Sequence, residues 1–303
     1  MDSKKKIIID TDIGDDLDDA IALFCAMSEG MDILGITTVF RDTQVRASMT
    51  RQLLSDFGHG YENVPVYAGF SSYGETLEEN QEHMGIFSSE EAKHSTDPQS
   101  AVDFIIDSCH RYGKNLTIIA IGPFCNIAKT IEKDPSALNL ANKVVIMGGA
   151  YFKQYADWNV MCDVPAADLM FRTLNNLECI GADVTHQLTV PESIIDALET
   201  REHSYLSQLY SLWHANYPSQ MLVPHDALAV YYALDPGICT TKSIHTTVIT
   251  EGMAKGLTLN VDSYSKASLN RHYELFDFSH TVKAALDVDL AKFHQFLLRD
   301  VVI

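Results

Sequence analysis

Six aspartates lie within ten residues near the start of the chain, in the segment DTDIGDDLDD at residues 10–19. An apolar run at 7–9 precedes them, and a helical apolar pattern at 20–24 follows them. This order predicts a buried strand, a glycine-containing loop and a helix, which places the aspartates at the carboxyl end of a strand. Ligands bind at that edge of open parallel sheets, and so many carboxylates repel one another unless a cation compensates them. The cluster therefore predicts a bound divalent metal ion.

Two structural interpretations compete with the metal site. Four of the aspartates would cap the following helix and complement its positive end, each contributing about 0.3–1 kcal/mol: Asp15, Asp16, Asp18 and Asp19. The whole segment could also be a solvated acidic loop. Capping does not account for Asp10 and Asp12, which belong to the end of the strand, and it does not need six carboxylates.

A histidine and a carboxylate come directly before a second helical run, in Pro224-His225-Asp226. Asp226 is either an ordinary helix cap or a further carboxylate for the metal. His225 is either a surface residue or a proton donor whose pKa lies near the working pH. The spacing alone leaves both pairs of interpretations open.

Two further segments carry polar groups beside turns. An acid, an aromatic ring and an amide follow one another in Asp157-Trp158-Asn159, a combination that suits the hydroxyls and the flat face of a sugar. A loop before a helix would have the same polarity for structural reasons. The turn Gly122-Pro123 before Cys125 exposes backbone carbonyls, which calcium accepts as ligands, although a plain tight turn explains it equally well.

The composition narrows the class of partner. The formal charge of −19 over 303 residues repels nucleic acid and anionic membrane surfaces, so small neutral ligands or cations are expected. The six cysteines form no CxxC pair, which favours free thiols in a reducing cytoplasm. The basic start MDSKKK is followed by only three apolar residues, so we expect no signal peptide, and no apolar run is long enough to span a membrane.

Apolar, β-branched runs alternate with helical patterns through the first two-thirds of the chain. The predicted strands are Lys6–Asp10, Ile33–Phe40, Val64–Ala68, Leu116–Ile121, Lys143–Met147 and Leu177–Ala182. The predicted helices are Asp18–Ser28, Thr43–Phe57, Pro98–Arg111, Phe124–Glu132, Pro165–Thr173 and Pro191–Glu199. This order predicts an α/β fold with a mainly parallel central sheet flanked by helices and a Rossmann-like core.

No composition break marks a linker, so we expect one domain over residues 1–303. The polar stretch Phe70–Thr96 has no clear period and predicts a long loop at the active site. From about Ser204 onward, helical segments mix with two β-like runs, Ile244–Thr250 and Gly256–Val261.

In this order the motifs resemble the inosine-uridine-preferring nucleoside hydrolase family. The resemblance covers nearly the whole chain, through the segments DTDIGDDLDDAIAL at 10–23, GITTVFRDT at 35–43, VPVYAG at 64–69, IAIGPFCNIA at 119–128, VVIMGGA at 144–150, DWN at 157–159, GADVTHQ at 181–187 and PHDALAV at 224–230. It implies an α/β enzyme that uses a tightly held calcium ion to hydrolyse the N-glycosidic bond of ribonucleosides. It also implies a homodimer or homotetramer.

The resemblance assigns roles by motif position. The implied calcium ligands are Asp12, Asp19, the backbone carbonyl of Cys125, and Asp226. Asp12 would also act as the base on the attacking water, and His225 would assist departure of the nucleobase. The sugar would be held by Asp18 and Asn159 at its 2′- and 3′-hydroxyls and by Asp157 at its 5′-hydroxyl. Such roles suit calcium, which takes about six to eight oxygen ligands, and an oxocarbenium-like transition state beside carboxylates.

The sequence departs from the family pattern near the sugar's 5′ end and the base. The first motif is two residues longer, so Asp15 or Asp16 could take the role given to Asp18 or Asp19. The second strand ends in Arg41-Asp42 where relatives have Gly-Asn, so Asp42 replaces an amide that contacts the substrate. Relatives often have glutamate in place of Asp157, and the loop after Gly149 is short. His83 is a candidate loop histidine near the ligand.

Two alternatives to the hydrolase remain open. Asp10-x-Asp12 after a first strand is also typical of haloacid dehalogenase-like phosphohydrolases, with Asp10 as the nucleophile, although Gly14 departs from their pattern. The altered positions Arg41-Asp42 and Asp157 would also fit a protein that binds ribose or a nucleoside with little or no turnover.

Overall fold

The computed structural model describes all residues except 1–4, 75–96, 154, 201–203, 264–279 and 303. Its strands are β1 (Lys6–Thr11), β2 (Asp32–Thr38), β3 (Val66–Ala68), β4 (Leu116–Ala120), β5 (Lys143–Met147), β6 (Leu177–Ile180), β7 (Cys239–Val248), β8 (Thr258–Asn260) and β9 (Thr281–Val288). Its α-helices are α1 (Asp18–Ser28), α2 (Thr43–Phe57), α3 (Pro98–Tyr112), α4 (Cys125–Lys133), α5 (Ala137–Leu140), α6 (Trp158–Cys162), α7 (Val164–Thr173), α8 (Ala182–Thr185), α9 (Glu192–Thr200), α10 (Tyr205–Asn216), α11 (His225–Leu234) and α13 (Leu290–Val302).

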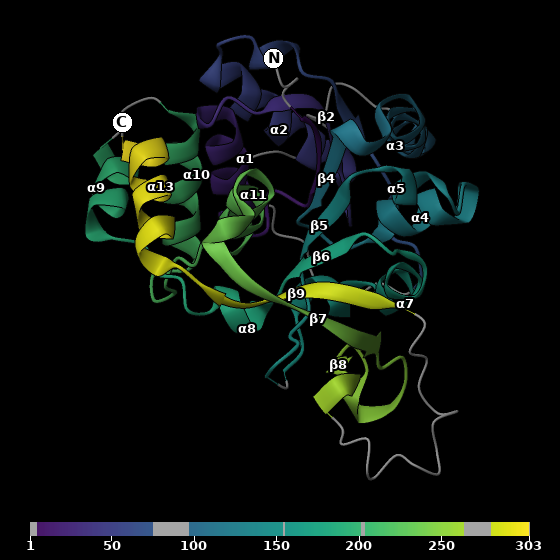
Figure 1. Cartoon of the computed structure of the whole chain (residues 1–303). Helices are drawn as coiled ribbons and strands as arrows, with labels where there is room; N and C mark the ends of the chain where they lie inside the picture. The colour runs from purple at the N-terminus through teal and green to yellow at the C-terminus, as the bar shows by residue number, and fades with distance from the viewer. Residues whose placement is uncertain (1–4, 75–96, 154, 201–203, 264–279, 303) are drawn as a thin grey trace, which may run out of the picture.

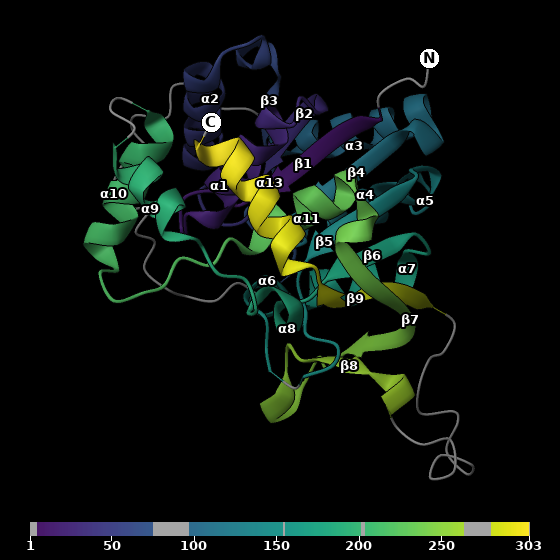
Figure 2. The ribbon, with the colours of Figure 1, turned by 60° about the vertical axis from the view of Figure 1, so that its left-hand side comes forward.

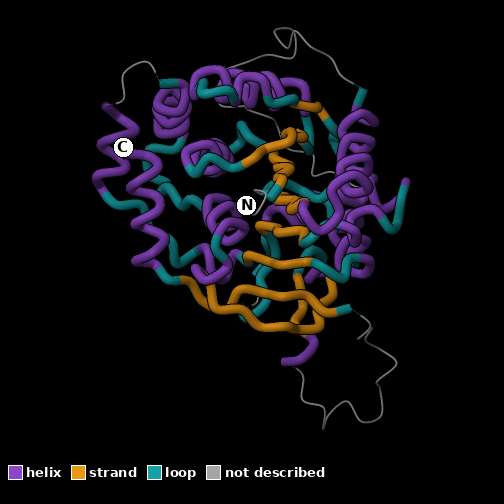
Figure 3. The backbone as a smooth tube through the Cα atoms, turned by 45° about the horizontal axis from the view of Figure 1, so that its top comes forward, coloured by secondary structure: helices purple, strands orange, loops and turns teal. Residues whose placement is uncertain are grey.

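Within the described residues the strands form one nine-stranded sheet in the order β3-β2-β1-β4-β5-β6-β9-β7-β8. The first six strands and β9 run parallel, whereas β7 is antiparallel to β9 and β8 is antiparallel to β7. Figure 3 shows the strands stacked through the centre of the molecule, with helices on both sides. The predicted α/β fold with a mainly parallel sheet is therefore confirmed.

Alternating side chains of the central strand β1 explain the two layers of helices. Ile7 and Ile9 belong to one apolar core, which includes residues of α1, α2, α10, α11 and α13. Ile8 belongs to a second core, which includes residues of α3, α4 and α7. Because successive side chains of a strand point to opposite faces, one short apolar run joins both layers. Figure 1 shows these two groups of helices on either side of the sheet.

The strand order reverses between β1 and β4, which are neighbours in the sheet although β2 and β3 lie between them in the chain. The crevice outside the carboxyl ends of the strands at such a reversal is where open α/β sheets bind ligands. The aspartate segment follows β1 at this point. The fold therefore places the predicted metal-binding segment at the site where the topology favours a ligand.

The last third of the chain differs most from the expected elements. β7 begins at Cys239 rather than near Ile244, and β9 inserts between β6 and β7. Figure 2 shows β7 and β8 at one end of the sheet, with α13 lying across α11. Of the predicted loop Phe70–Thr96, residues 75–96 lie outside the described part of the chain. No helix in the described part is both long and apolar enough to cross a membrane.

Candidate active site

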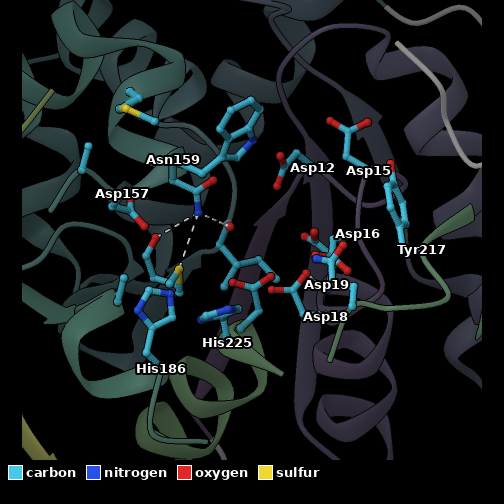
Figure 4. Close-up of a pocket in the computed structure, with 18 of the residues that line it drawn as sticks. Asp12, Asp15, Asp16, Asp18, Asp19, Asp157, Asn159, His186, Tyr217 and His225 are labelled. Atoms are coloured by element: carbon cyan, nitrogen blue, oxygen red, sulfur yellow. Dashed lines mark hydrogen bonds between the residues drawn. The ribbon is translucent and has the colours of Figure 1, made fainter. Parts of the chain in front are cut away.

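A cavity of about 640 Å³ opens at the carboxyl ends of the parallel strands, and loops after β1, β2, β4, β5 and β6 line it together with the start of α11. Seven carboxylates line this cavity: Asp12, Asp15, Asp16, Asp18, Asp19, Asp157 and Asp226. Figure 4 shows the labelled aspartates of the first loop on one side and Asp157, Asn159 and His186 on the other. Segments far apart in sequence thus converge on one acidic pocket.

Three buried carboxylates come within metal-binding distance of one another. Asp18, Asp19 and Asp226 each offer an oxygen, and these oxygens lie within 4.8 Å of one another. Asp18 and Asp19 begin α1 and Asp226 is the second residue of α11, and these two helices pack together. Burial, and then repulsion between neighbouring carboxylates, raises the pKa of all three well above the usual range. Clustered carboxylate oxygens are the hard ligands that calcium prefers, so this donor set fits the ion that the family resemblance implies.

Asp12 lies beside this group without belonging to the same set of three. It follows β1, is buried and lines the cavity. Burial raises its pKa well above the usual value, and the carboxylate of Asp19 raises it further. The Thr11 hydroxyl donates a hydrogen bond to Asp19. Asp18, for which the family resemblance implies contact with the sugar, is thus grouped with the predicted ligands Asp19 and Asp226.

The side chain of Asp10 is buried in the core and does not face the cavity. Its side chain is fully buried, and it accepts hydrogen bonds from the Thr37 hydroxyl and, at 2.7 Å, from the Asn126 amide. It is not among the described residues that line the cavity, and burial raises its pKa to about 7. A nucleophile must reach the substrate, so the phosphohydrolase alternative with Asp10 as nucleophile is wrong.

A buried arginine that the sequence reasoning missed holds the aspartate loop. Arg46 of α2 is 0% exposed, and its Nη1 donates to the carbonyls of Asp12 and Ile13, the latter at 2.9 Å. Its Nε donates to the Phe40 carbonyl at 2.8 Å, and its Nη2 pairs with Asp15 at 2.8 Å. One guanidinium therefore ties the loop after β1 to the loop after β2.

Arg46→Met is expected to lower the free energy of unfolding by about 3 kcal/mol, because it leaves the half-buried carboxylate of Asp15 and several buried carbonyls without a donor. Urea unfolding followed by circular dichroism measures this change. Arg111→Met removes an exposed arginine from the last turn of α3 and is the matched control. An Arg46→Met protein as stable as that control would contradict the assignment of Arg46 as the support of the loop.

The amide of Asn159 is oriented by two backbone carbonyls. Its Nδ2 donates to Ile121 at 2.7 Å and to Met147 at 3.1 Å, as the dashed lines in Figure 4 indicate. Both amide hydrogens are thereby used, which leaves the side-chain oxygen as the group available to a ligand. Asp157 caps α6 by accepting from the Val160 N–H at 3.1 Å, and burial raises its pKa to about 6.

His225 begins α11 beside the carboxylate group. Its Nδ1 lies 2.6 Å from the Thr185 hydroxyl, and the His186 ring lies edge-on to it at 5.3 Å. Burial, and then His186, lowers the pKa of His225 to about 4. The expectation of a pKa near the working pH is therefore wrong. At neutral pH the ring is uncharged, and a hydroxyl that donates to Nδ1 leaves Nε2–H as the donor.

Two predicted site residues, Asp42 and Cys125, are not among the described residues that line the cavity. Asp42 caps α2, accepting from the Val45 N–H at 3.1 Å. Cys125 begins α4, and its buried thiol lies 3.4 Å from Asp163. The predicted metal ligand is the backbone carbonyl of Cys125 rather than its thiol, and that role remains a prediction. His83 lies outside the described residues. Conversely, Arg41, His186 and Tyr217 line the cavity although the sequence reasoning gave them no role. Of these three residues, Arg41 could have been suspected from the sequence, because it belongs to the pair Arg41-Asp42 that departs from the family pattern.

Comparison with known proteins identifies the family of this chain. The family model described as inosine-uridine preferring nucleoside hydrolase matches residues 7–295. Uridine nucleosidase 1 of Arabidopsis thaliana is 30% identical over 280 residues, covering 84% of this chain and 81% of that protein. A solved plant nucleoside hydrolase aligns with a TM-score of 0.80 at 26% identity, covering 99% of this chain and 100% of that one. A solved purine-preferring ribonucleoside hydrolase from Gardnerella vaginalis aligns with a TM-score of 0.77 at 28% identity, covering 98% of both chains. The chain therefore belongs to the inosine-uridine preferring nucleoside hydrolase family of ribonucleoside N-glycosidases.

Proposed function

We propose that this chain hydrolyses ribonucleosides to ribose and free nucleobase with a bound calcium ion, and that Asp12, Asp19 and Asp226 are among its ligands. The observation that carries the proposal is the convergence of Asp18, Asp19 and Asp226 on one point of an acidic cavity in a chain of this family. Calcium would supply a positive centre that orients a water molecule and the sugar hydroxyls. The backbone carbonyl of Cys125 completes the proposed ligand set.

The remaining steps fall to side chains of the chain itself. Asp12 takes a proton from the attacking water, and the carboxylates around the sugar stabilise the positive charge that develops on the ribose ring. Asn159 accepts from a ribose hydroxyl through its free side-chain oxygen, and Asp157 faces the 5′-hydroxyl. Asp18 either binds a ribose hydroxyl or joins the metal ligands. When the glycosidic bond breaks, its electron pair goes to the nucleobase, and His225 donates a hydrogen bond to that leaving group.

His225→Gln is expected to lower kcat for inosine or uridine about 10²-fold, since the oriented hydrogen bond that stabilises the charge developing on a poor leaving group is lost. For a riboside whose leaving group is 4-nitrophenolate, which departs without protonation, we expect a much smaller loss. His110→Gln, at an exposed histidine paired with Asp134, is the control. An equal loss on both leaving groups would mean that His225 acts on the fold or on the metal rather than on the leaving base.

The choice of base belongs to the proposal, because relatives with similar folds differ in it: one is named a uridine nucleosidase and another a purine-preferring hydrolase. We propose inosine and uridine as first substrates. The test is chromatographic detection of base release from a panel of purine and pyrimidine ribonucleosides. Release would support the hydrolase, whereas nucleoside binding by calorimetry without any release would favour the binding protein with little turnover.

A cytoplasmic location and a homodimer or homotetramer complete the proposal. All six cysteines are free and buried, which supports a reducing compartment. Light scattering coupled to size exclusion measures the assembly directly. A monomer at micromolar concentration would contradict the assembly that the family resemblance implies.

A further inference from the structure

The backbone after β2 is strained where it reaches the cavity. Phe40 and Arg41 have φ angles of 66° and 58°, which side chains with a Cβ rarely adopt. The strain is held by hydrogen bonds from the Arg46 side chain to the Phe40 carbonyl at 2.8 Å and from the Arg41 N–H to the Ser71 carbonyl at 3.0 Å. Strained residues persist only where surrounding contacts fix them, and they cluster at ligand sites. The conformation places Arg41 at the edge of the cavity.

Arg41 is the one lysine or arginine among the described residues that line this cavity. Its side chain is only 9% exposed, and its Nη1 contacts Asp15 at a long 3.4 Å. Its Nη2 is buried and has no hydrogen-bond partner within the described part of the chain. A buried donor without an acceptor is costly, and a guanidinium can only donate. A ligand that supplies an acceptor beside Asp15 would remove that cost.

The negative charge of the cavity limits which ligand groups could accept a hydrogen bond from Arg41. Seven carboxylates line it, and Arg41 already lies against one of them, so a phosphate or carboxylate ligand would meet net repulsion. A neutral carbonyl oxygen accepts from a guanidinium without adding charge. In Figure 4, Asp12 lies between Asp15 and the pair Asp157 and Asn159, which are proposed to hold the ribose. Arg41 pairs with Asp15, so in the proposed binding mode its guanidinium belongs to the part of the cavity that is left for the base.

We propose that Arg41, oriented by Asp15, is a specificity-determining residue that donates a hydrogen bond to the exocyclic carbonyl which distinguishes inosine from adenosine and uridine from cytidine. The inference rests on the proposed function, because it concerns the base of the same substrate. An amino group at that position presents donors to a donor and is rejected. The two departures from the family motif are then linked, since the longer aspartate loop supplies Asp15 and the altered strand end supplies Arg41.

Arg41→Met tests the proposal through ratios of kcat/KM, inosine to adenosine and uridine to cytidine. We expect kcat/KM for the carbonyl-bearing member of each pair that the enzyme accepts to fall about 10- to 100-fold, and the amino member to change less than about threefold. Because each ratio compares two substrates on one protein, a fraction of misfolded variant cancels. Arg172→Met, an exposed arginine paired with Asp168 on α7, is the matched control and should leave both ratios unchanged.

Unchanged ratios in Arg41→Met, or equal losses on both members of each pair, would overturn the proposal and leave Arg41 as a support for the loop. A loss seen only with inosine 5′-monophosphate would also overturn it and assign Arg41 to a phosphate. Calorimetric dissociation constants for the same four nucleosides report the same ratios without turnover. If the dissociation constants showed the Arg41-dependent ratios but no base were released, the proposed hydrolysis would be wrong. The assignment of Arg41 to the carbonyl of the base would still stand.

Discussion

Asp12→Asn should lower kcat/KM for base release about 10⁴-fold while the protein remains folded. The side chain lies at the end of the central strand β1 and lines the cavity beside the carboxylate group. Asparagine keeps the shape of the side chain but cannot take a proton from water, so the variant loses the proposed base and one negative ligand together. Chromatography of released base over a range of enzyme concentrations measures the loss, and circular dichroism verifies the fold.

Asp103→Asn is the matched control, because Asp103 is an exposed carboxylate on α3 paired with Lys133 far from the cavity. It should retain full activity. If Asp12→Asn kept more than about a tenth of the activity, Asp12 would not be the base, and Asp15 or Asp16, which also line the cavity, would be tested next.

Removal of divalent cations is expected to abolish base release and to lower the melting temperature. Without a cation, Asp18, Asp19 and Asp226 must be held together as protonated or mutually repelling groups, as the upward direction of their pKa values indicates. An ion that binds only the native state stabilises it by about 2.7 kcal/mol at a hundredfold excess over its dissociation constant. Activity and thermal unfolding are measured after EDTA treatment and dialysis.

Calcium addition should restore both properties. Magnesium should restore them less well, since it demands a smaller octahedral site and gives up its water reluctantly. The Asp226→Asn variant provides a second test of the site, because calcium should raise its melting temperature only weakly. If EDTA changed neither activity nor melting temperature, the calcium site would be rejected even though the family assignment stands.

The regular part of the fold was predictable because its signals are local. Each of the six predicted strands and six predicted helices has a counterpart in the structure whose ends agree within two residues. The C-terminal strands were harder for a physical reason: the first half of β7 is polar and partly exposed, in the sequence CTTKS, so it lacks a continuous apolar run. The local sequence of β9 does not indicate that this strand pairs with β6, which lies about 100 residues earlier in the chain.

The sequence predicted which residue types form the candidate site, but it predicted their burial and their pKa values less well. The acidic segment and His225-Asp226 were identified from spacing, and the structure brings them to one cavity. The pKa of His225 depends on burial, which sequence does not report. Arg46 stands in a helix with many polar residues, where an arginine is expected at the surface, yet it is fully buried. Asp42 satisfies the start of α2 instead of facing the cavity.

The place of β9 in the sheet matters while the chain is being synthesised. β6 ends at Ile180, and the strand that covers its outer edge starts only at Thr281. At about 5–20 residues per second, the ribosome leaves that edge unpaired for roughly 5–20 s, during which its open N–H and C=O groups can capture another nascent chain. We therefore expect truncations that end before β9 to aggregate during expression, although they contain every residue of the described cavity.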